Sequence, residues 1–161
     1  MAFLIDGNNL LHAMAEAGPE LGRAGLCKDL GLLVRGGQRV HVVFDGPAPP
    51  GPLARQIAAH AHGATVTYAA PRTADEVIER LIAEDSAPRQ LVVVSTDRRI
   101  RKAARRRRAK PIRSEEFARR LTELADEASR PRHPLEPPEK RAGLAPDQAD
   151  EWLRVFDIER G

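Results

Sequence analysis

The chain has 161 residues, of which 42% are hydrophobic and 30% charged, so we expect one compact α/β domain and not a pair of domains. No apolar run approaches the ~20 residues of a membrane-spanning helix, and Asp6 interrupts the N-terminal apolar stretch before it could form a secretory signal. A single cysteine, Cys27, excludes an internal disulfide and a cysteine-rich zinc site. We therefore expect a soluble, cytoplasmic monomer, with a dimer left open.

The net charge of +3 conceals an uneven distribution. Residues 98–113 hold ten of the 26 Lys and Arg residues and none of the 23 Asp and Glu residues, so the rest of the chain is net acidic. A single basic segment on an otherwise acidic protein favours binding of a polyanion at that segment over nonspecific binding across the whole surface.

Short apolar runs alternate along the chain with segments of helical period, which is typical of a parallel sheet covered by crossover helices. The predicted strands are residues 2–5, 40–44, 65–68, 91–95 and 111–113. The predicted helices are residues 9–17, 20–35, 53–62, 74–84, 98–108 and 115–128. The first, second and fourth strands are continuous apolar runs, as expected of strands buried on both faces.

The C-terminal part of the sequence changes in composition. Five prolines in residues 131–146 predict an extended linker after a folded domain of residues 1–130. A last amphipathic helix is predicted at residues 147–161, and its apolar stripe consists of Ala149, Trp152, Leu153 and Phe156. This helix either docks on its own domain or binds a partner.

Aspartates follow three of the predicted strands. Asp6 comes directly after the first strand, Asp45 directly after the second, and Asp97 two residues after the fourth. In an open α/β sheet the ligand crevice lies beyond the carboxyl ends of the strands, so these side chains are expected to converge.

Asp75 is predicted to join this group from a helix. It shares a helical face with Ile78 and Ile82, which makes it the acid that points inward. The sequence TADE at residues 73–76 also fits a capping box, so Glu76 is expected to bond back to the start of the helix.

Three or four carboxylates in one crevice repel one another unless protons or a cation neutralise them. Oxygen ligands without an accompanying Cys or His pair favour Mg²⁺ or Mn²⁺ over zinc. Such an ion would activate water for phosphodiester hydrolysis. Each acid also has a structural alternative: Asp6 and Asp45 as strand-end turns, Asp97 as a helix N-cap, and Asp75 as a favourable charge at a helix N-terminus.

Four motifs carry a family resemblance: LIDGNN at residues 4–9, VVFDG at 42–46, TADE at 73–76 and VVSTD at 93–97. In order and spacing they resemble the motifs of the YacP-like branch of NYN domains, PIN-like nucleases that include a ribosome-associated bacterial endoribonuclease. The resemblance covers roughly residues 2–130. It implies a PIN-like three-layer α/β sandwich, with a mostly parallel sheet of strand order 3-2-1-4-5 and helices on both faces.

The resemblance also implies roles for individual residues. By motif position, the metal-binding acids are Asp6, Asp75 and Asp97, and Asp45 is kept as a further candidate from its place after the second strand. Asn9 would orient a metal-bound water or Asp6 and completes the predicted catalytic set; its alternative role is to cap the first helix. Many NYN relatives carry a second Asp where this chain has Arg99.

The predicted helix at residues 98–108 has a thin apolar seam and is otherwise basic. Because it starts beside the proposed site, its side chains are placed to hold phosphates that flank a scissile bond. The residues predicted to contact RNA are Arg98, Arg101, Lys102, Arg105, Arg106 and Arg108. The alternative is a solvated helix face.

Together these patterns and the resemblance predict an endoribonuclease that uses Mg²⁺ or Mn²⁺, and the resemblance implies mRNA or ribosome-bound RNA as its substrate. One alternative is a catalytically inactive RNA- or ribosome-binding module with the same fold. A less favoured one is an aspartyl phosphotransferase with Asp6 as nucleophile, for which Asn8 stands where a second acid is expected.

Overall fold

The computed structural model of the chain describes residues 1–17 and 22–130. Its elements, in chain order, are β1 (Ala2–Asp6), α1 (Gly7–Ala17), α2 (Arg23–Arg35), β2 (Arg39–Phe44), α3 (Gly51–Ala61), β3 (Thr65–Tyr68), α4 (Ala74–Glu84), the 3₁₀ turn η1 (Pro88–Gln90), β4 (Leu91–Val94), α5 (Arg98–Arg106), β5 (Lys110–Ile112) and α6 (Ser114–Ser129). All five predicted strands and six predicted helices of this region are present, with ends that differ by at most three residues. The predicted linker and last helix lie outside the described residues.

The five strands form one sheet in the order β3-β2-β1-β4-β5, and every neighbouring pair is parallel. This confirms the predicted α/β fold and strand order. The central strand β1 lies between β2 and β4, so the residues that follow these three strands emerge at the same edge of the sheet.

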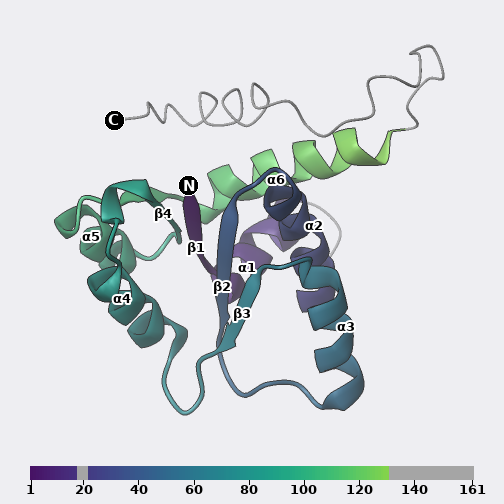
Figure 1. Ribbon diagram of the computed structural model, residues 1–161, viewed down its shortest axis with the longest axis horizontal. Helices are drawn as coiled ribbons and strands as arrows, with labels where there is room; N and C mark the ends of the chain where they lie inside the picture. The colour runs from purple at the N-terminus through teal and green to yellow at the C-terminus, as the bar shows by residue number, and fades with distance from the viewer. Residues whose placement is uncertain (18–21, 131–161) are drawn as a thin grey trace. The chain divides into compact units, whose positions relative to one another are not determined.

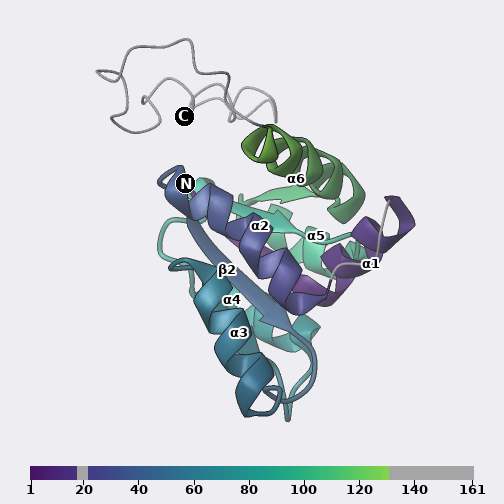
Figure 2. The same ribbon diagram turned by 90° about the vertical axis from the view of Figure 1, so that its right-hand side faces the viewer.

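Helices cover both faces of the sheet (Figures 1 and 2). On one face, Leu4 and Val93 pack with Ile78 of α4 and Ile100 of α5 in a buried apolar cluster. On the other face, the ring of Phe3 lies 5.8 Å from that of Phe117 in α6. None of the helices in residues 1–17 and 22–130 is long and apolar enough to cross a membrane.

The step from β1 to α1 has no connecting loop, because the strand ends at Asp6 and the helix begins at Gly7. A Cβ at Gly7 would lie 2.4 Å from a ring carbon of Phe44 and 2.9 Å from the side chain of Val42. Glycine therefore allows the start of α1 to press against β2. This close packing holds Asp6 at the carboxyl edge of the sheet.

Candidate functional site

Asp6 and Asp97 are joined through the side chain of Ser95. The Ser95 hydroxyl donates to Asp6 Oδ2 at 3.3 Å and accepts a hydrogen bond from the backbone N–H of Asp97 at 3.1 Å. Ser95 is fully buried, and Asp6 is 5% exposed. The pairing of β1 with β4 thus places Asp6 beside the turn that carries Asp97.

Both of these aspartates cap a helix. Asp97 Oδ1 accepts hydrogen bonds from the backbone N–H groups of Arg99 at 2.6 Å and Ile100 at 3.3 Å, as its structural alternative predicted. Asp6 Oδ1 accepts from the backbone N–H of Asn9 at 3.0 Å, so Asp6 bonds the backbone that follows its strand, as its structural alternative predicted, and this bond caps α1. The caps fix the rotamers of both carboxylates at the edge of the sheet.

Asp45 and Asp75 lie at the start of α4. Asp45 Oδ1 accepts a hydrogen bond of 2.7 Å from the backbone N–H of Ala74, the first residue of the helix. Asp75, the next residue, is half-buried. Asp45 thus holds the N-terminus of α4 at the carboxyl edge, which brings Asp75 to the same place. The predicted capping box of Thr73 and Glu76 is also present.

The carboxylates at this edge act on one another electrostatically. Burial above all raises the pKa of Asp6 to about 6, and the negative charges of Asp75 and Asp45 add to the rise. Burial also raises the pKa of Asp75, as do the charges of Asp97 and Asp45, whereas the charge of Arg99 lowers it. Four aspartates from four chain segments therefore share one region of negative charge, which Arg99 offsets only in part.

The donor set at this edge fits a hydrated ion better than a protein cage. No group of three or more His, Cys, Asp or Glu side chains within the described ranges is close enough to hold a metal by itself. Mg²⁺ usually keeps several waters and is bound through one or two carboxylates together with substrate phosphates, and Mn²⁺ takes the same oxygen donors. The oxygen-only set and the raised pKa of Asp6 therefore suit a hard divalent cation.

Asn9 links α1 to two later segments of the chain through hydrogen bonds. Its side-chain oxygen accepts hydrogen bonds from the backbone N–H of Thr96 at 3.0 Å and from the hydroxyl of Ser114 at 2.6 Å. The predicted alternative, in which Asn9 caps the first helix, is wrong because Asp6 has that role. Orientation of a metal-bound water by Asn9 stays a prediction.

The arginines of α5 and the turn after it fall into two sets. Arg99 donates through Nε and Nη2 to the carboxylate of Glu79 at 2.6 and 2.7 Å, and Arg107 donates to the carbonyl oxygens of Ile82 and Asp85 at the end of α4. Neither belongs to the set predicted to contact RNA. That predicted set makes no ion pair within residues 1–17 and 22–130; it comprises the exposed Arg98, Lys102, Arg105, Arg106 and Arg108 and the part-buried Arg101.

The sequence matches the YacP-like NYN domain over residues 3–156. The chain belongs to this family. The structure is similar to that of Rae1 (YacP) from Bacillus subtilis, with 24% sequence identity, a TM-score of 0.59, and coverage of 80% of this chain and 77% of that one. The W164L mutant of Rae1 aligns with 24% identity and a TM-score of 0.58, over 78% of this chain and 77% of the other. No curated protein matches.

Membership of the YacP-like NYN family confirms the resemblance, and the likeness to Rae1 shows a shared PIN-like fold. The family match extends through residue 156, beyond the domain boundary predicted at residue 130. It therefore includes the segment predicted as a linker and part of the predicted last helix.

Three hydroxyl side chains form hydrogen bonds that hold the site together, and none of them is among the site residues predicted from the sequence. Ser95 links the two capping aspartates, and Thr96 donates through Oγ1 to Glu115 at 2.7 Å while accepting from the backbone N–H of Ser114 at 3.3 Å. The polar pair at positions 95 and 96, directly after a buried strand, was a signal for Ser95 and Thr96. Ser114 bonds a side chain 105 positions away, and no local pattern reveals such a contact.

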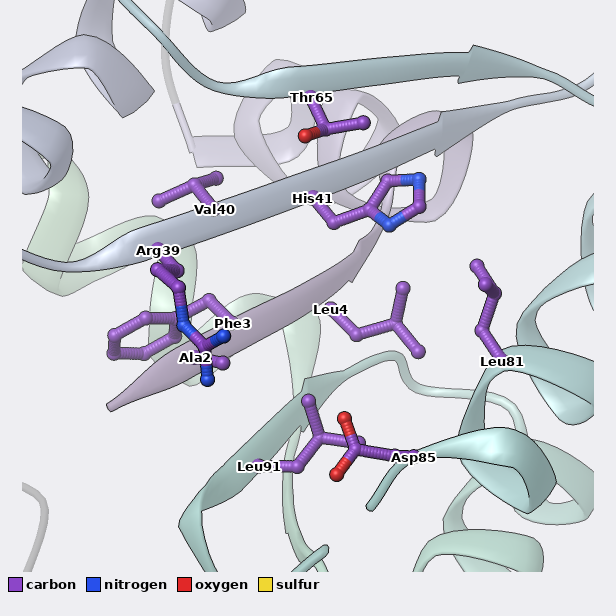
Figure 3. Close-up of a pocket in the computed structure, with 10 residues that line it drawn as sticks. All are labelled: Ala2, Phe3, Leu4, Arg39, Val40, His41, Thr65, Leu81, Asp85 and Leu91. Atoms are coloured by element: carbon purple, nitrogen blue, oxygen red, sulfur yellow. The ribbon is translucent and has the colours of Figure 1, made fainter. Parts of the chain in front are cut away.

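A pocket of about 240 Å³ lies at the opposite edge of the sheet (Figure 3). Ala2, Arg39, Thr65 and Leu91, the first residues of their strands, line it. Because Asp6 ends β1, the pocket and the aspartates are at opposite ends of the strands, and the pocket is not part of the candidate site.

Proposed function

We propose that this protein is an endoribonuclease that hydrolyses RNA phosphodiester bonds with a hydrated Mg²⁺ or Mn²⁺ at Asp6, Asp75 and Asp97, bound directly by one or two of these carboxylates and through water by the rest. The observation that carries the proposal is the gathering of four aspartates at one edge of the sheet, where burial first of all, and then the charges of neighbouring aspartates, raise the pKa of Asp6 and Asp75. Membership of the YacP-like NYN family supports it, as does the basic helix that starts at this edge.

In this proposal the bound ion would polarise a water and a phosphoryl oxygen for hydrolysis. The chain's own contribution is to hold its carboxylates in place beforehand. The hydroxyl of Ser95 and the backbone N–H of Asn9 orient Asp6, and the first turn of α5 orients Asp97. Because burial raises the pKa of Asp6 to about 6, ion binding at acidic pH would release a proton from this carboxyl group.

The exposed basic residues of α5 and its C-terminal turn would bind the backbone of the substrate. Phosphate contacts are independent of sequence, and with 4% aromatic residues the chain has few rings on which bases could stack. The substrate class is therefore RNA recognised through its backbone, with mRNA and ribosome-bound RNA as the candidates.

One observation favours the second candidate, an inactive RNA-binding module. Arg99 is held beside Asp75 by Glu79, and its charge lowers the pKa of Asp75. The guanidinium of Arg99 thus offsets part of the negative charge of the aspartates without a metal ion. A phosphotransferase with Asp6 as nucleophile is less favoured, since Asp6 is 5% exposed and both of its oxygens accept hydrogen bonds.

The test compares wild type with Asp97→Asn on structured and unstructured RNA, in Mg²⁺, Mn²⁺ or EDTA. Asparagine can keep the cap of α5 while it removes the charge. We expect metal-dependent cleavage by the wild type, a loss of turnover by several orders of magnitude in the variant, and similar RNA binding by both. Glu127→Gln, at an exposed acid of α6, is the matched control and should cleave like the wild type.

Two results would contradict the proposal. If the wild type and Asp97→Asn are equally inert while both bind RNA, the binding module is correct. If both cleave equally well, Asp97 is not a metal ligand.

A further inference from the structure

Arg101 differs from the other basic residues of α5 because it is part-buried. Its Nε atom is buried and has no hydrogen-bond partner in the part of the chain that the structure describes. Buried polar groups are nearly always paired, and a charged one is costly to leave without an acceptor. The Nε–H of Arg101 is therefore a donor for which the described residues supply no acceptor.

Other positive charges surround Arg101. Burial lowers its pKa, and the charges of Arg113, Arg105 and Arg98 lower it further. We call these four residues the Arg101 cluster. Like charges raise one another's energy unless an anion lies among them.

The Arg101 cluster combines two elements of the chain. Arg113 comes directly after β5, whereas the other three arginines lie on α5. The last residue of β5, Ile112, pairs with Val94 and accepts a hydrogen bond of 3.1 Å from the backbone N–H of Ser95. The cluster therefore lies at the carboxyl edge of the sheet, on the β5 side of the aspartates.

Glu115 is an acid whose charge raises the pKa of Arg101, and it does not neutralise the cluster. Its Oε2 accepts a hydrogen bond from Thr96 Oγ1 at 2.7 Å, and it forms no ion pair with the described arginines. Arg99, by contrast, has a bidentate partner in Glu79. Among the described residues, the arginine beside Asp75 thus has a bidentate ion pair, whereas the Arg101 cluster has no ion pair.

We propose that the Arg101 cluster is a subsite for one backbone phosphate of the RNA, held jointly by Arg101 and Arg113, beside the phosphate that is cleaved. Guanidinium groups bind phosphate through paired, charge-assisted hydrogen bonds, and two of them from different elements fix its position. The inference rests on the proposed function, which supplies RNA as the polyanion. It adds Arg113, which lies outside the basic helix, and it separates this subsite from Lys102, Arg106 and Arg108.

The test measures binding of a short single-stranded RNA in EDTA over a series of KCl concentrations. On a single strand, each neutralised phosphate contributes about 0.7 to the slope of log K against log salt. We expect Arg101→Gln and Arg113→Gln each to weaken binding about ten-fold at low salt. The double variant should lower the slope by about 0.7, the value for one shared phosphate, and not by the roughly 1.4 of two separate phosphates.

Arg55→Gln provides the matched control. Arg55 is exposed on α3, which contacts β3. Because β3 and β5 are the two outer strands of the sheet, Arg55 is remote from the Arg101 cluster and its variant should leave the slope unchanged. Because Arg113 is exposed, Arg113→Gln tests the subsite even if Arg101→Gln disturbs folding. A slope that falls by about 1.4, or that does not fall in the double variant, overturns the proposal.

A scan with single neutral methylphosphonate linkages distinguishes an RNA phosphate from a free anion. One linkage position should weaken wild-type binding about ten-fold and leave the double variant unaffected. If instead inorganic phosphate stabilises the wild type alone and no linkage position has this effect, the cluster binds a free anion and the proposal is wrong.

The two proposals can fail separately. A wild type that cleaves RNA with Mn²⁺ but shows no slope change in the double variant refutes the phosphate subsite alone. A wild type that shows the expected slopes but never cleaves supports the subsite and refutes the nuclease.

Discussion

Replacing Asp6 with asparagine should stabilise the metal-free protein at neutral pH, although Asp6 belongs to the candidate site. Burial raises the pKa of Asp6 from 3.8 to about 6, so the folded protein holds this proton more tightly than the unfolded chain. Stability then falls as the pH rises from about 4 to about 6 and stays lower above that range. The cost of the charged carboxylate is ~3 kcal/mol at pH 7.5 and below ~1 kcal/mol at pH 4.

The variant should retain the hydrogen bonds that Asp6 makes. Asparagine caps helices about as well as aspartate, so its oxygen can accept from the backbone N–H of Asn9. Its amide nitrogen can donate to the hydroxyl of Ser95, which donates to Asp6 Oδ2 in the wild type. The removal of a buried charge is therefore the main change in free energy.

Urea denaturation of both proteins in EDTA, at pH 4 and pH 7.5, measures this difference. At pH 7.5 Asp6→Asn should be the more stable protein by up to ~3 kcal/mol, and at pH 4 the gap should fall below ~1 kcal/mol. With saturating Mg²⁺ or Mn²⁺ the wild type should gain more stability than the variant, so the gap should shrink or change sign. Glu127→Gln controls for the loss of one exposed negative charge.

A variant less stable than the wild type at pH 7.5 in EDTA, or a gap that does not depend on pH, would refute the argument from burial. If the gap behaves as expected in EDTA and is unchanged by Mg²⁺ and Mn²⁺, the burial argument holds but Asp6 does not bind the ion.

Two further substitutions test how the fold presents the site. Gly7→Ala should destabilise the protein by about 1–3 kcal/mol in urea denaturation, because the new Cβ would lie 2.4 Å from a ring carbon of Phe44. Gly22→Ala, which meets nothing within 4 Å and changes only the N-cap of α2, should cost less than Gly7→Ala, and equal effects at the two positions would show that the contact with Phe44 is not the cause. Thr73→Ala should cost about 1 kcal/mol and lower the melting temperature by about 2–4 °C, because it removes the cap of α4. Glu76→Gln, which can keep the capping box, should melt close to the wild type, and a larger loss there would assign the effect to charge.

The gathering of the aspartates was predictable because it depends on rules that operate along the chain. Buried strands read as continuous apolar runs, and the carboxyl ends of parallel strands share one edge of the sheet. Asp6 and Asp97 therefore had to approach each other once β1 and β4 were neighbours, an order that the family resemblance implied. Asp75 followed from helical spacing and a capping box, both of which are local patterns.

The remaining contacts depend on packing between distant segments. The start of α1 at Gly7 follows from its approach to Phe44, and the role of Asn9 depends on Ser114 in α6. Within the basic segment, Arg99 and Arg107 have the same residue type as their neighbours. Their partners lie on α4 and at its C-terminal end, so no pattern within the segment could separate them from the arginines that make no ion pair with the described residues.

The structural and functional interpretations of the aspartates are compatible. Asp6, Asp45 and Asp97 each accept a hydrogen bond from a backbone N–H in the first turn of a helix, at α1, α4 and α5. Three helix N-termini, each with a partial positive charge, thus face the acidic edge and offset part of its repulsion. This explains how the fold keeps four acids together before any cation binds.

Asp97 accepts both of its capping hydrogen bonds through Oδ1, so its Oδ2 atom and its charge can still serve a metal. For this reason asparagine and alanine variants of Asp97 report on different roles, because asparagine keeps the cap and loses the charge whereas alanine loses both. A purely structural aspartate would make Asp97→Asn nearly neutral and Asp97→Ala about 1 kcal/mol less stable, with activity following stability. A metal ligand would make both variants equally inactive on RNA, and only the alanine variant would lose stability.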